Sequence, residues 1–316
     1  MAYYLGIDGG GSKTSCAVGD ARSILATSVA GPSNITRVEE ARARESLHQA
    51  IREACAAAKI HPRQIDRACI GVAGVGRDEV ADVVRKIAAE VIRGEIEVVG
   101  DMAIAMEAAF GAGPGVIVIA GTGSIAYGRN AQGITARAGG WGFAISDEGS
   151  AHWIGRSVVA GLFREIDQDE QRLGAQGAVE GSLLLRELEA AWNLRSFDEF
   201  VRAANSHPDF AALFPSILGS ADGGNLLAQR VLEQAGGELA RLPGTVIRQL
   251  FPELDASLTI MKVAMVGGVF KHSTRVRECF CHEIRKFAPR VRVNQEVVEP
   301  LTGALLIARQ VHTKHK

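Results

Sequence analysis

Residues 6–14 read Gly6-Ile7-Asp8-Gly9-Gly10-Gly11-Ser12-Lys13-Thr14. Short apolar runs stand on both sides, Tyr3-Tyr4-Leu5 and Cys16-Ala17-Val18, a pattern typical of two strands joined by a tight turn. Glycines let backbone N–H groups come close to a phosphate chain, and polar side chains after them add donors. We therefore predict that phosphate is bound by Gly10, Gly11, Ser12, Lys13 and Thr14. Asp8, at the end of the first strand, is placed to hold Mg²⁺ through water.

This turn differs from two well-known phosphate motifs. The G-x-x-x-x-G-K-[ST] spacing of a Walker A loop is absent. A strand rather than a helix is predicted to follow, unlike in the dinucleotide-binding fingerprint. Taken alone, the stretch also fits an ordinary β-turn.

A second and a third glycine-rich turn follow later in the chain. The run Val116 to Ala120 leads into Gly121-Thr122-Gly123-Ser124, and a strand-like run follows again. The repeat suggests a duplicated domain, with two phosphate-binding turns facing each other across a cleft. The Thr122 hydroxyl and the amides of Gly121 and Gly123 are expected to hold the transferred phosphoryl group, with a plain hairpin as the alternative. The third turn contains Gly267 and Gly268, which we expect to pack against an adenine or a ribose.

The most specific segment is Gly139-Gly140-Trp141-Gly142-Phe143-Ala144-Ile145-Ser146-Asp147-Glu148-Gly149-Ser150-Ala151-His152-Trp153-Ile154-Gly155. It closely matches the G-G-W-G-x-x-x-x-D-E-G-S-x-x-W-I-G pattern of one protein group. With the three turns in this order, the chain resembles the N-acetylglucosamine kinase and BadF/BadG-type ATPase group, within the acetate/sugar kinase, actin and heat-shock chaperone superfamily. The resemblance covers nearly the whole chain. It implies two ribonuclease H-like (actin-like ATPase) domains of duplicated β-β-β-α-β-α-β-α type flanking a central cleft.

The order of predicted elements agrees with an α/β fold. Strands are predicted within 3–28 and at 67–71, 95–99, 116–120, 124–129, 133–138 and 290–293. Helices are predicted at 39–59, 78–93, 102–110, 150–164, 180–192, 196–206, 225–250, 273–287 and 302–309. The best linker is Gly111-Ala112-Gly113-Pro114-Gly115. We expect one domain at 1–114 plus 302–316 and a second, with helical insertions, at 115–301, with the active site between them.

Composition narrows the functional classes. The chain has 316 residues, 47% hydrophobic and 22% charged, which suits two packed domains and argues against disorder. A net charge of -1 without a basic stripe argues against nucleic acid as a partner. The chain lacks an apolar stretch of membrane-spanning length, and its N-terminus does not read as a signal peptide. We therefore expect a cytoplasmic protein that does not contact membranes.

Asp101 is the candidate catalytic base. It follows the apolar strand Ile96-Glu97-Val98-Val99-Gly100, so it stands at a strand's C-terminal end. Phosphoryl transfer needs a positioned oxygen nucleophile, and a carboxylate near a sugar hydroxyl can accept its proton. An Asp ahead of a helix is also a common N-cap, and the two roles are compatible. Sugar kinases of the superfamily carry their base at the matching position, which favours catalysis.

The resemblance also implies sugar contacts at Asn34, Trp141 and Asp147. Gly140, which lets the backbone pass close to a ligand, and Thr122, at the transferred phosphoryl group, complete the predicted substrate site. Trp141 offers a flat face to a sugar ring, and Asp147 can accept hydrogen bonds from sugar hydroxyls. Turn or capping roles are the alternatives for Asn34 and Asp147. The loop 71–76 is expected to approach the sugar through backbone groups. Adenine is expected near Gly224, Gly267 and Gly268, although Asn225 replaces the acidic residue common in relatives and is equally suited to cap a helix.

Three functions remain open on these grounds. The leading one is an ATP- and Mg²⁺-dependent kinase for the 6-hydroxyl of an amino sugar, N-acetylglucosamine first, with glucosamine and N-acetylmuramate as alternatives. The second is a BadF-type ATPase, which in that group holds an iron–sulfur cluster through cysteines; this chain has none between Cys69 and Cys279. The third is a catalytically silent sugar sensor. Homodimers are usual in the group, so a homodimer is expected.

Overall fold

The computed structural model describes residues 1–72, 74, 78–173, 182–206, 208–251 and 261–310, with the backbone alone for residues 78 and 169–173. The chain divides into two compact units: Met1–Ile117 with the chain from Val298 onward, and Val118–Val297. Each unit is built around one five-stranded sheet. Among the described residues, no helix combines the length and apolar character needed to cross a membrane.

The sheet of the first unit has the strand order β3-β2-β1-β4-β5. Its strands are β1 (Tyr3–Gly9), β2 (Thr14–Gly19), β3 (Ile24–Ala30), β4 (Ile65–Val72) and β5 (Glu95–Gly100). The first three pair antiparallel, as hairpins require, whereas β4 and β5 join in parallel after helical crossovers. The helical elements are α1 (Glu40–Ala57), the 3-10 turn η1 (Pro62–Gln64), α2 (Asp78–Ala89), α3 (Asp101–Phe110) and α12 (Pro300–Arg309).

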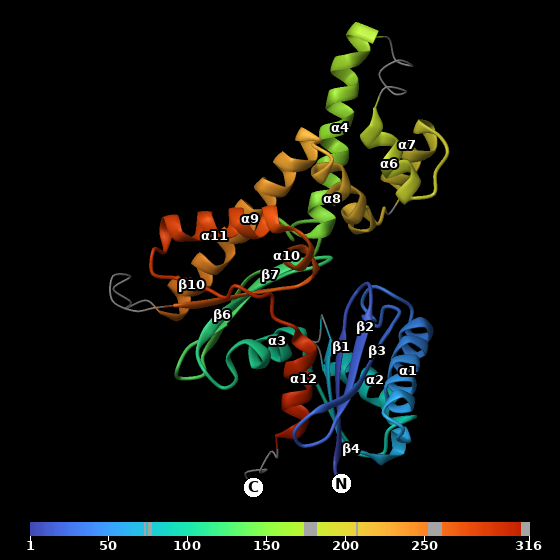
Figure 1. Ribbon diagram of the computed structural model, residues 1–316, viewed down its shortest axis with the longest axis vertical. Coiled ribbons are helices and arrows are strands. Elements are labelled where there is room, and N and C mark those ends of the chain that lie inside the picture. Colours follow the sequence, from blue (N-terminus) through green and yellow to red (C-terminus); the bar gives the residue numbers. More distant parts are fainter. Residues whose placement is uncertain (73, 75–77, 174–181, 207, 252–260, 311–316) are drawn as a thin grey trace. The chain divides into compact units, whose positions relative to one another are not determined.

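Helices cover both faces of this sheet. On one face, α1 and α2 pack over alternate strand residues such as Leu5 and Ile7, which are fully buried. On the other face, α3 and α12 pack together and against β1 (Figure 1). Gly6 permits this second contact, because a β-carbon there would lie 2.5 Å from the Leu305 nitrogen. The last helix of the chain thus belongs to the core of the first unit.

The sheet of the second unit has the order β10-β9-β6-β7-β8. Its strands are β6 (Gly115–Ala120), β7 (Ser124–Arg129), β8 (Thr135–Gly139), β9 (Lys262–Val266) and β10 (Arg292–Val293). Reversed, this order is β8-β7-β6-β9-β10. In both sheets, the first strand of the unit thus lies in the centre, the second and third strands follow on one side, and the fourth and fifth follow on the other. This identity confirms the duplicated α/β fold that the repeated strand–turn–strand pattern predicts.

The second unit differs from the first by its large helical share. Between β8 and β9 come α4 (Ala151–Leu173), α6 (Leu183–Ala191), α7 (Phe197–Asn205), the 3-10 turn η2 (Phe210–Leu213), α8 (Phe214–Asp222) and α9 (Leu226–Leu250). After β9 come α10 (Gly268–His272) and α11 (Thr274–Phe287). Helix α9 packs against β7, β8, α4 and α11, so it links the sheet to the added helices. The helices α8 and α10 are not predicted from the sequence, and α4 runs beyond its predicted end at residue 164.

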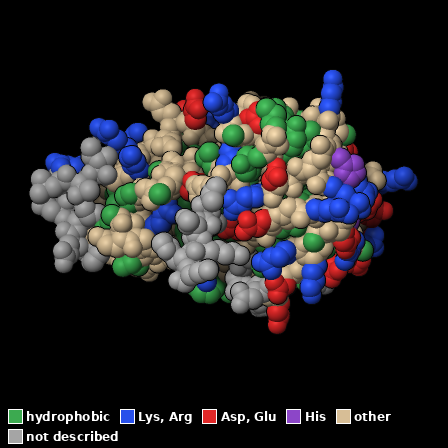
Figure 2. Space-filling model, turned by 90° about the horizontal axis from the view of Figure 1, so that it is seen from below, with side chains coloured by type: hydrophobic (Ala, Val, Ile, Leu, Met, Phe, Trp, Pro, Cys, Tyr) green, Lys and Arg blue, Asp and Glu red, His purple; other side chains and the backbone are tan. Residues whose placement is uncertain are grey.

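The surface carries charges of both signs. On the face drawn in Figure 2, Lys and Arg side chains lie among Asp and Glu side chains. This mixture agrees with the net charge of -1.

Candidate active site

The first glycine-rich turn joins β1 to β2, and hydrogen bonds from the loop after β3 hold it in place. The Gly10 N–H donates to the Lys13 carbonyl at 2.9 Å, which closes the turn. The Gly10 carbonyl accepts from the N–H groups of Ser33 and Asn34, at 3.2 and 3.3 Å. The loop after β3 therefore fixes the position of the turn.

Thr14 is turned into the protein. Its side chain is fully buried, and its Oγ1 lies 2.7 Å from both the Gly31 carbonyl and Ser33 Oγ. A hydroxyl has one proton to donate, so these two partners satisfy it. Thr14 thus connects β2 to the loop after β3 through hydrogen bonds. Its side chain therefore anchors the turn from inside the protein.

Asp8 and Asp101 lie close enough to influence each other's charge. Asp8 is the last residue but one of β1 and pairs with Gly71 of β4. Its pKa is raised to about 6, first by burial and next by the negative charge of Asp101, with Lys13 lowering it and Glu299 raising it. Three carboxylates and one ammonium group thus share one electrostatic neighbourhood in the first unit.

Asp101 is the first residue of α3, and the helix cap is not its role. Gly100 occupies the N-cap position, while Asp101 Oδ1 accepts from the Met102 N–H at 2.9 Å. Burial raises the pKa of Asp101, and this hydrogen bond partly offsets the rise. The carboxylate is placed at the C-terminal end of β5, as the sequence predicts.

Asn34 makes the turn that its residue type favours. Its Oδ1 accepts from the Thr36 N–H at 3.0 Å and from the Thr36 hydroxyl at 2.7 Å. The side chain is nearly buried. The carboxamide oxygen is therefore committed to the loop, and the amide nitrogen is the group it has left for a ligand. Residues 73, 75 and 76 of the neighbouring loop 71–76 lie outside the described residues.

In the second unit, hydrogen bonds join the second glycine-rich turn to the start of α4. The Gly121 N–H donates to the Gly123 carbonyl at 2.9 Å, and the Gly121 carbonyl accepts from the Ala151 N–H at 2.9 Å. Ser124 Oγ donates to the Glu148 carbonyl at 2.8 Å. The turn and the loop 143–148 thus form one connected structure.

Asp147 contacts this turn directly. A β-carbon built on Gly123 would lie 2.7 Å from Asp147 Oδ2 and 3.3 Å from Oδ1. The Asp147 side chain is 4% exposed, and its φ of 68° is left-handed, an uncommon conformation for a residue other than glycine. A buried carboxylate held on a strained backbone at the turn is a feature of functional sites.

Gly140 and Trp141 follow β8. Gly140 has a φ of 71°, and a β-carbon there would lie 2.7 Å from Ile125 Cδ1, so the position requires glycine. The Trp141 side chain is 65% exposed, with the Arg137 guanidinium 4.0 Å from its ring centroid. This cation–π contact holds the indole at the protein surface.

The predicted adenine residues separate into two places. Gly267 has a φ of 101° and packs on the end of β6, where its β-carbon would lie 2.4 Å from the Ala120 carbonyl. Gly268 begins α10 directly after it. Gly224 lies in the α8–α9 turn, and Asn225 next to it caps α9 by accepting from the Ala228 N–H at 2.9 Å. The capping alternative for Asn225 is thus the observed one.

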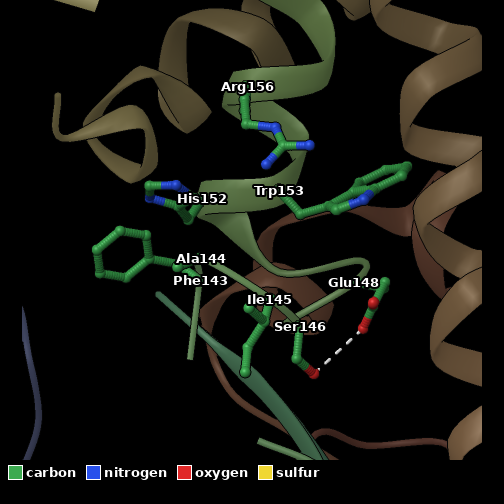
Figure 3. Close-up of a pocket in the computed structure, with 8 residues that line it drawn as sticks. All are labelled: Phe143, Ala144, Ile145, Ser146, Glu148, His152, Trp153 and Arg156. Carbon is green, nitrogen blue, oxygen red and sulfur yellow. Dashed lines mark hydrogen bonds between the residues drawn. The ribbon is translucent and has the colours of Figure 1, made fainter. Parts of the chain in front are cut away.

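A cavity of about 160 Å³ lies between the loop 143–148 and the first turns of α4, and it was not predicted from the sequence. It is lined by Phe143, Ala144, Ile145, Ser146, Glu148, His152, Trp153 and Arg156. In Figure 3, the side chains from α4 stand across from Ser146 and Glu148 of the loop, where Ser146 Oγ lies 3.3 Å from Glu148 Oε2.

A metal ion would have few direct protein ligands here. Among the described residues, no cluster of three or more His, Cys, Asp or Glu side chains has metal-binding geometry. Asp8 and Asp101 still suit a hydrated divalent cation, because a positive charge would relieve the repulsion that raises the pKa of Asp8. The negative charge of Glu299 also raises the pKa of Asp8. The sequence analysis does not predict a site role for Glu299, which stands directly before Pro300.

Comparison with known proteins gives full-length matches. The model of the BadF/BadG/BcrA/BcrD ATPase family matches residues 5–308. The N-acetylmuramic acid/N-acetylglucosamine kinase of Clostridium acetobutylicum is 31% identical over 320 residues, which cover 98% of this chain and 99% of the relative. The N-acetyl-D-glucosamine kinase of Dictyostelium discoideum is 26% identical over 318 residues, covering 96% and 97%.

Solved structures share the fold. A candidate N-acetylglucosamine kinase from Chromobacterium violaceum superposes with a TM-score of 0.67 at 23% identity, covering 98% of this chain and 99% of that one. A ROK family glucokinase from Streptomyces griseus, solved with glucose and AMPPNP, gives 0.57 at 16% identity, covering 98% and 100%. These likenesses confirm the predicted actin-like ATPase fold. The match over nearly the whole chain, with a relative at 31% identity, shows that the protein belongs to the BadF/BadG/BcrA/BcrD ATPase family.

Proposed function

We propose that the protein is an ATP-dependent amino-sugar kinase that phosphorylates the 6-hydroxyl of N-acetylglucosamine, or of glucosamine or N-acetylmuramate. The names of its two curated relatives support this substrate class. The observation that carries the proposal is the buried Asp101 carboxylate at the end of β5, beside Asp8 of the first glycine-rich turn.

Asp101 acts as the general base in this proposal. Burial raises the pKa of Asp101, and a carboxylate with a raised pKa accepts a proton more readily than an exposed one. It takes the proton of the sugar hydroxyl as the oxygen bonds to the γ-phosphorus and the bond to the ADP leaving oxygen breaks. Its hydrogen bond from Met102 holds the carboxylate in one orientation.

The phosphates of ATP are held by backbone amides and by charge. The turn 10–13, with the Lys13 ammonium, and the turn 121–123 would approach the phosphates through backbone N–H groups other than those of Gly10 and Gly121, which bond within their own turns. Asp8 would hold Mg²⁺ through water, and that ion, when bound, neutralises charge on the phosphates. Gly224, Gly267 and Gly268 take the nucleoside.

The sugar is bound by Asn34, Gly140, Trp141 and Asp147 with Thr122 in this proposal. Asp147 supports it best, because its buried carboxylate lies against Gly123 of the second turn and would bring a bound hydroxyl near the phosphoryl group. Domains at 1–114 plus 302–316 and at 115–301 would close on the substrates and exclude water. We further propose a cytoplasmic homodimer, as is usual for the group it resembles.

The test is ADP release with ATP and Mg²⁺ over a panel of N-acetylglucosamine, glucosamine, N-acetylmuramate, N-acetylmannosamine and glucose, with a control that lacks sugar. Release with one or two amino sugars, reduced at least about 1,000-fold in Asp101→Asn, is the expected result. Equal release with and without sugar would instead support a BadF-type ATPase. Sugar binding without any ADP release would indicate a catalytically silent sensor.

The ATPase alternative has one argument against it in the sequence. Its members hold an iron–sulfur cluster through cysteines near the second phosphate-binding turn, and here no cysteine lies between Cys69 and Cys279. The kinase is therefore the function that we favour.

A further inference from the structure

The cavity beside the loop 143–148 has a charged side chain that none of the described protein groups neutralises. Arg156 lines the cavity and is exposed. Within the part of the chain that the structure describes, it has no hydrogen-bond or ion-pair partner. An arginine presents several N–H donors in a planar fork that matches the two oxygens of a carboxylate. The cavity thus contains an available binding group for an anion.

The other polar groups of the cavity limit where an anion can bind. Glu148 carries a negative charge, and Ser146 Oγ lies 3.3 Å from its Oε2. The Glu148 carboxylate repels an anion, and the Ser146 hydroxyl donates to that carboxylate, so the oxygens on this side accept from hydroxyl groups instead. In Figure 3 they lie on the loop side, whereas Arg156 extends from α4. A ligand with a carboxylate at one end and hydroxyl groups at the other fits this separation of charge.

One side of the cavity is aromatic. The His152 ring lies 4.7 Å from the Phe143 ring, centroid to centroid, and 5.3 Å from the Phe210 ring, edge-on. His152 is itself buried, whereas Phe143 is 51% exposed. These rings give the cavity an apolar side against which the carbon atoms of a ligand can pack.

The cavity also adjoins the proposed sugar site. Two of its lining residues, Ser146 and Glu148, stand on either side of Asp147 in the sequence. The Asp147 carboxylate lies against Gly123 of the phosphate-binding turn. A sugar held at Asp147 would therefore lie beside the loop whose residues Ser146 and Glu148 line this cavity.

We propose that the cavity is the subsite for a carboxylate attached to the sugar substrate, with Arg156 as the counter-ion. The substrate class is then an amino sugar with a carboxylate on an ether side chain, such as N-acetylmuramate, whose lactyl group would enter the cavity. This inference rests on the proposed function and adds a specificity-determining residue to it.

Calorimetric titration without nucleotide tests the subsite apart from catalysis. N-acetylmuramate and N-acetylglucosamine are titrated into the wild type, Arg156→Gln and the control Arg164→Gln. Arg164 lies two turns further along α4, is also exposed, and does not line the cavity. We expect Arg156→Gln to weaken N-acetylmuramate binding about 10- to 100-fold and to change N-acetylglucosamine binding less than about twofold. Arg164→Gln should change neither, and Arg156→Lys should recover part of the loss.

Two results would overturn the subsite. One is an equal loss for both sugars in Arg156→Gln, which marks a structural role. The other is a wild type that does not bind N-acetylmuramate. ADP release separates this from the kinase proposal: release with N-acetylglucosamine but no N-acetylmuramate binding refutes the subsite alone. Arg156-dependent N-acetylmuramate binding without ADP release from any sugar refutes the kinase alone.

Discussion

A β-carbon placed on Gly123 would lie 2.7 Å from Asp147 Oδ2, so the glycine of the second turn and the aspartate of the loop 143–148 pack against each other without room for a methyl group. The two residues come from segments 24 positions apart in the chain. Their contact joins the proposed phosphoryl site to the proposed sugar site.

Gly123→Ala should therefore displace the Asp147 carboxylate. We expect the KM for the amino sugar to rise about tenfold or more, because a misplaced carboxylate loses its hydrogen bonds to the substrate. Steady-state kinetics at varied sugar concentration measure this. Gly121→Ala is the matched control, since nothing lies within 4 Å of its β-carbon, and its KM for sugar should stay within about twofold. Equal effects of both variants on that KM would contradict the account.

Asp8→Asn should stabilise the protein in EDTA at pH 7. The pKa of Asp8 is about 6 in the folded protein, above the ordinary value of 3.8 for an aspartate. The folded state thus holds the proton more tightly than the unfolded state. The free energy of unfolding therefore falls as the pH rises from 3.8 to about 6, and it remains lower at higher pH. We expect a gain on the order of 2 kcal/mol in the free energy of unfolding for Asp8→Asn at pH 7, fading toward pH 4.

The control for this titration is Asp101→Asn. Removing that negative charge should lower the pKa of Asp8, because the Asp101 charge raises it in the wild type. The stability loss assigned to Asp8 should then occur at lower pH. Urea unfolding from pH 4 to 8 measures both variants, and a wild-type-like pH profile for Asp8→Asn would rule out the contribution of Asp8, and one for Asp101→Asn would rule out the coupling.

Gly267→Ala should destabilise the fold. Its left-handed backbone and the Ala120 carbonyl, 2.4 Å from the added carbon, both oppose a side chain. We expect a loss on the order of 3 kcal/mol in unfolding free energy. In the matched control Gly268→Ala, the nearest atom lies 4.0 Å away, so its unfolding midpoint should stay near that of the wild type. Similar midpoints for the two variants would show that the close contact is not rigid.

Thr14→Val tests the anchoring of the first turn. It removes a buried hydroxyl that lies 2.7 Å from two polar partners, at an almost unchanged side-chain volume. The partners lose a hydrogen bond, so we expect a loss of about 1–3 kcal/mol in unfolding free energy. Thr27→Val, at an exposed position of β3, is the control and should have little effect. If both valine variants unfold alike, Thr14 does not anchor the turn.

Much of the fold could be predicted because its signals are local. The apolar runs around Gly9 to Gly11 and around Gly121 to Gly123 mark the hairpins that begin each sheet, and the parallel strands follow amphipathic helices. Helix α8 was missed because Gly219 and Gly223-Gly224 read as turn signals, although tertiary packing buries Phe214 and Ile217. Helix α10 has five residues, too few for a periodic pattern.

The site was harder to predict, because its contacts join distant residues. Thr14 reads as a phosphate donor until its partners Gly31 and Ser33 are known. Glu299 reaches the field of Asp8 only because α12 packs on β1. The left-handed backbone of Asp147 and the cavity beside it leave no mark on the local sequence pattern.

The most direct test of the central claim is the identity of the phosphorylated product. ³¹P NMR would follow the protein with ATP, Mg²⁺ and each amino sugar in turn. The account predicts a phosphomonoester signal coupled to the protons on carbon 6 of at least one sugar, growing as ADP appears. Inorganic phosphate as the sole new signal, with every sugar, would contradict it.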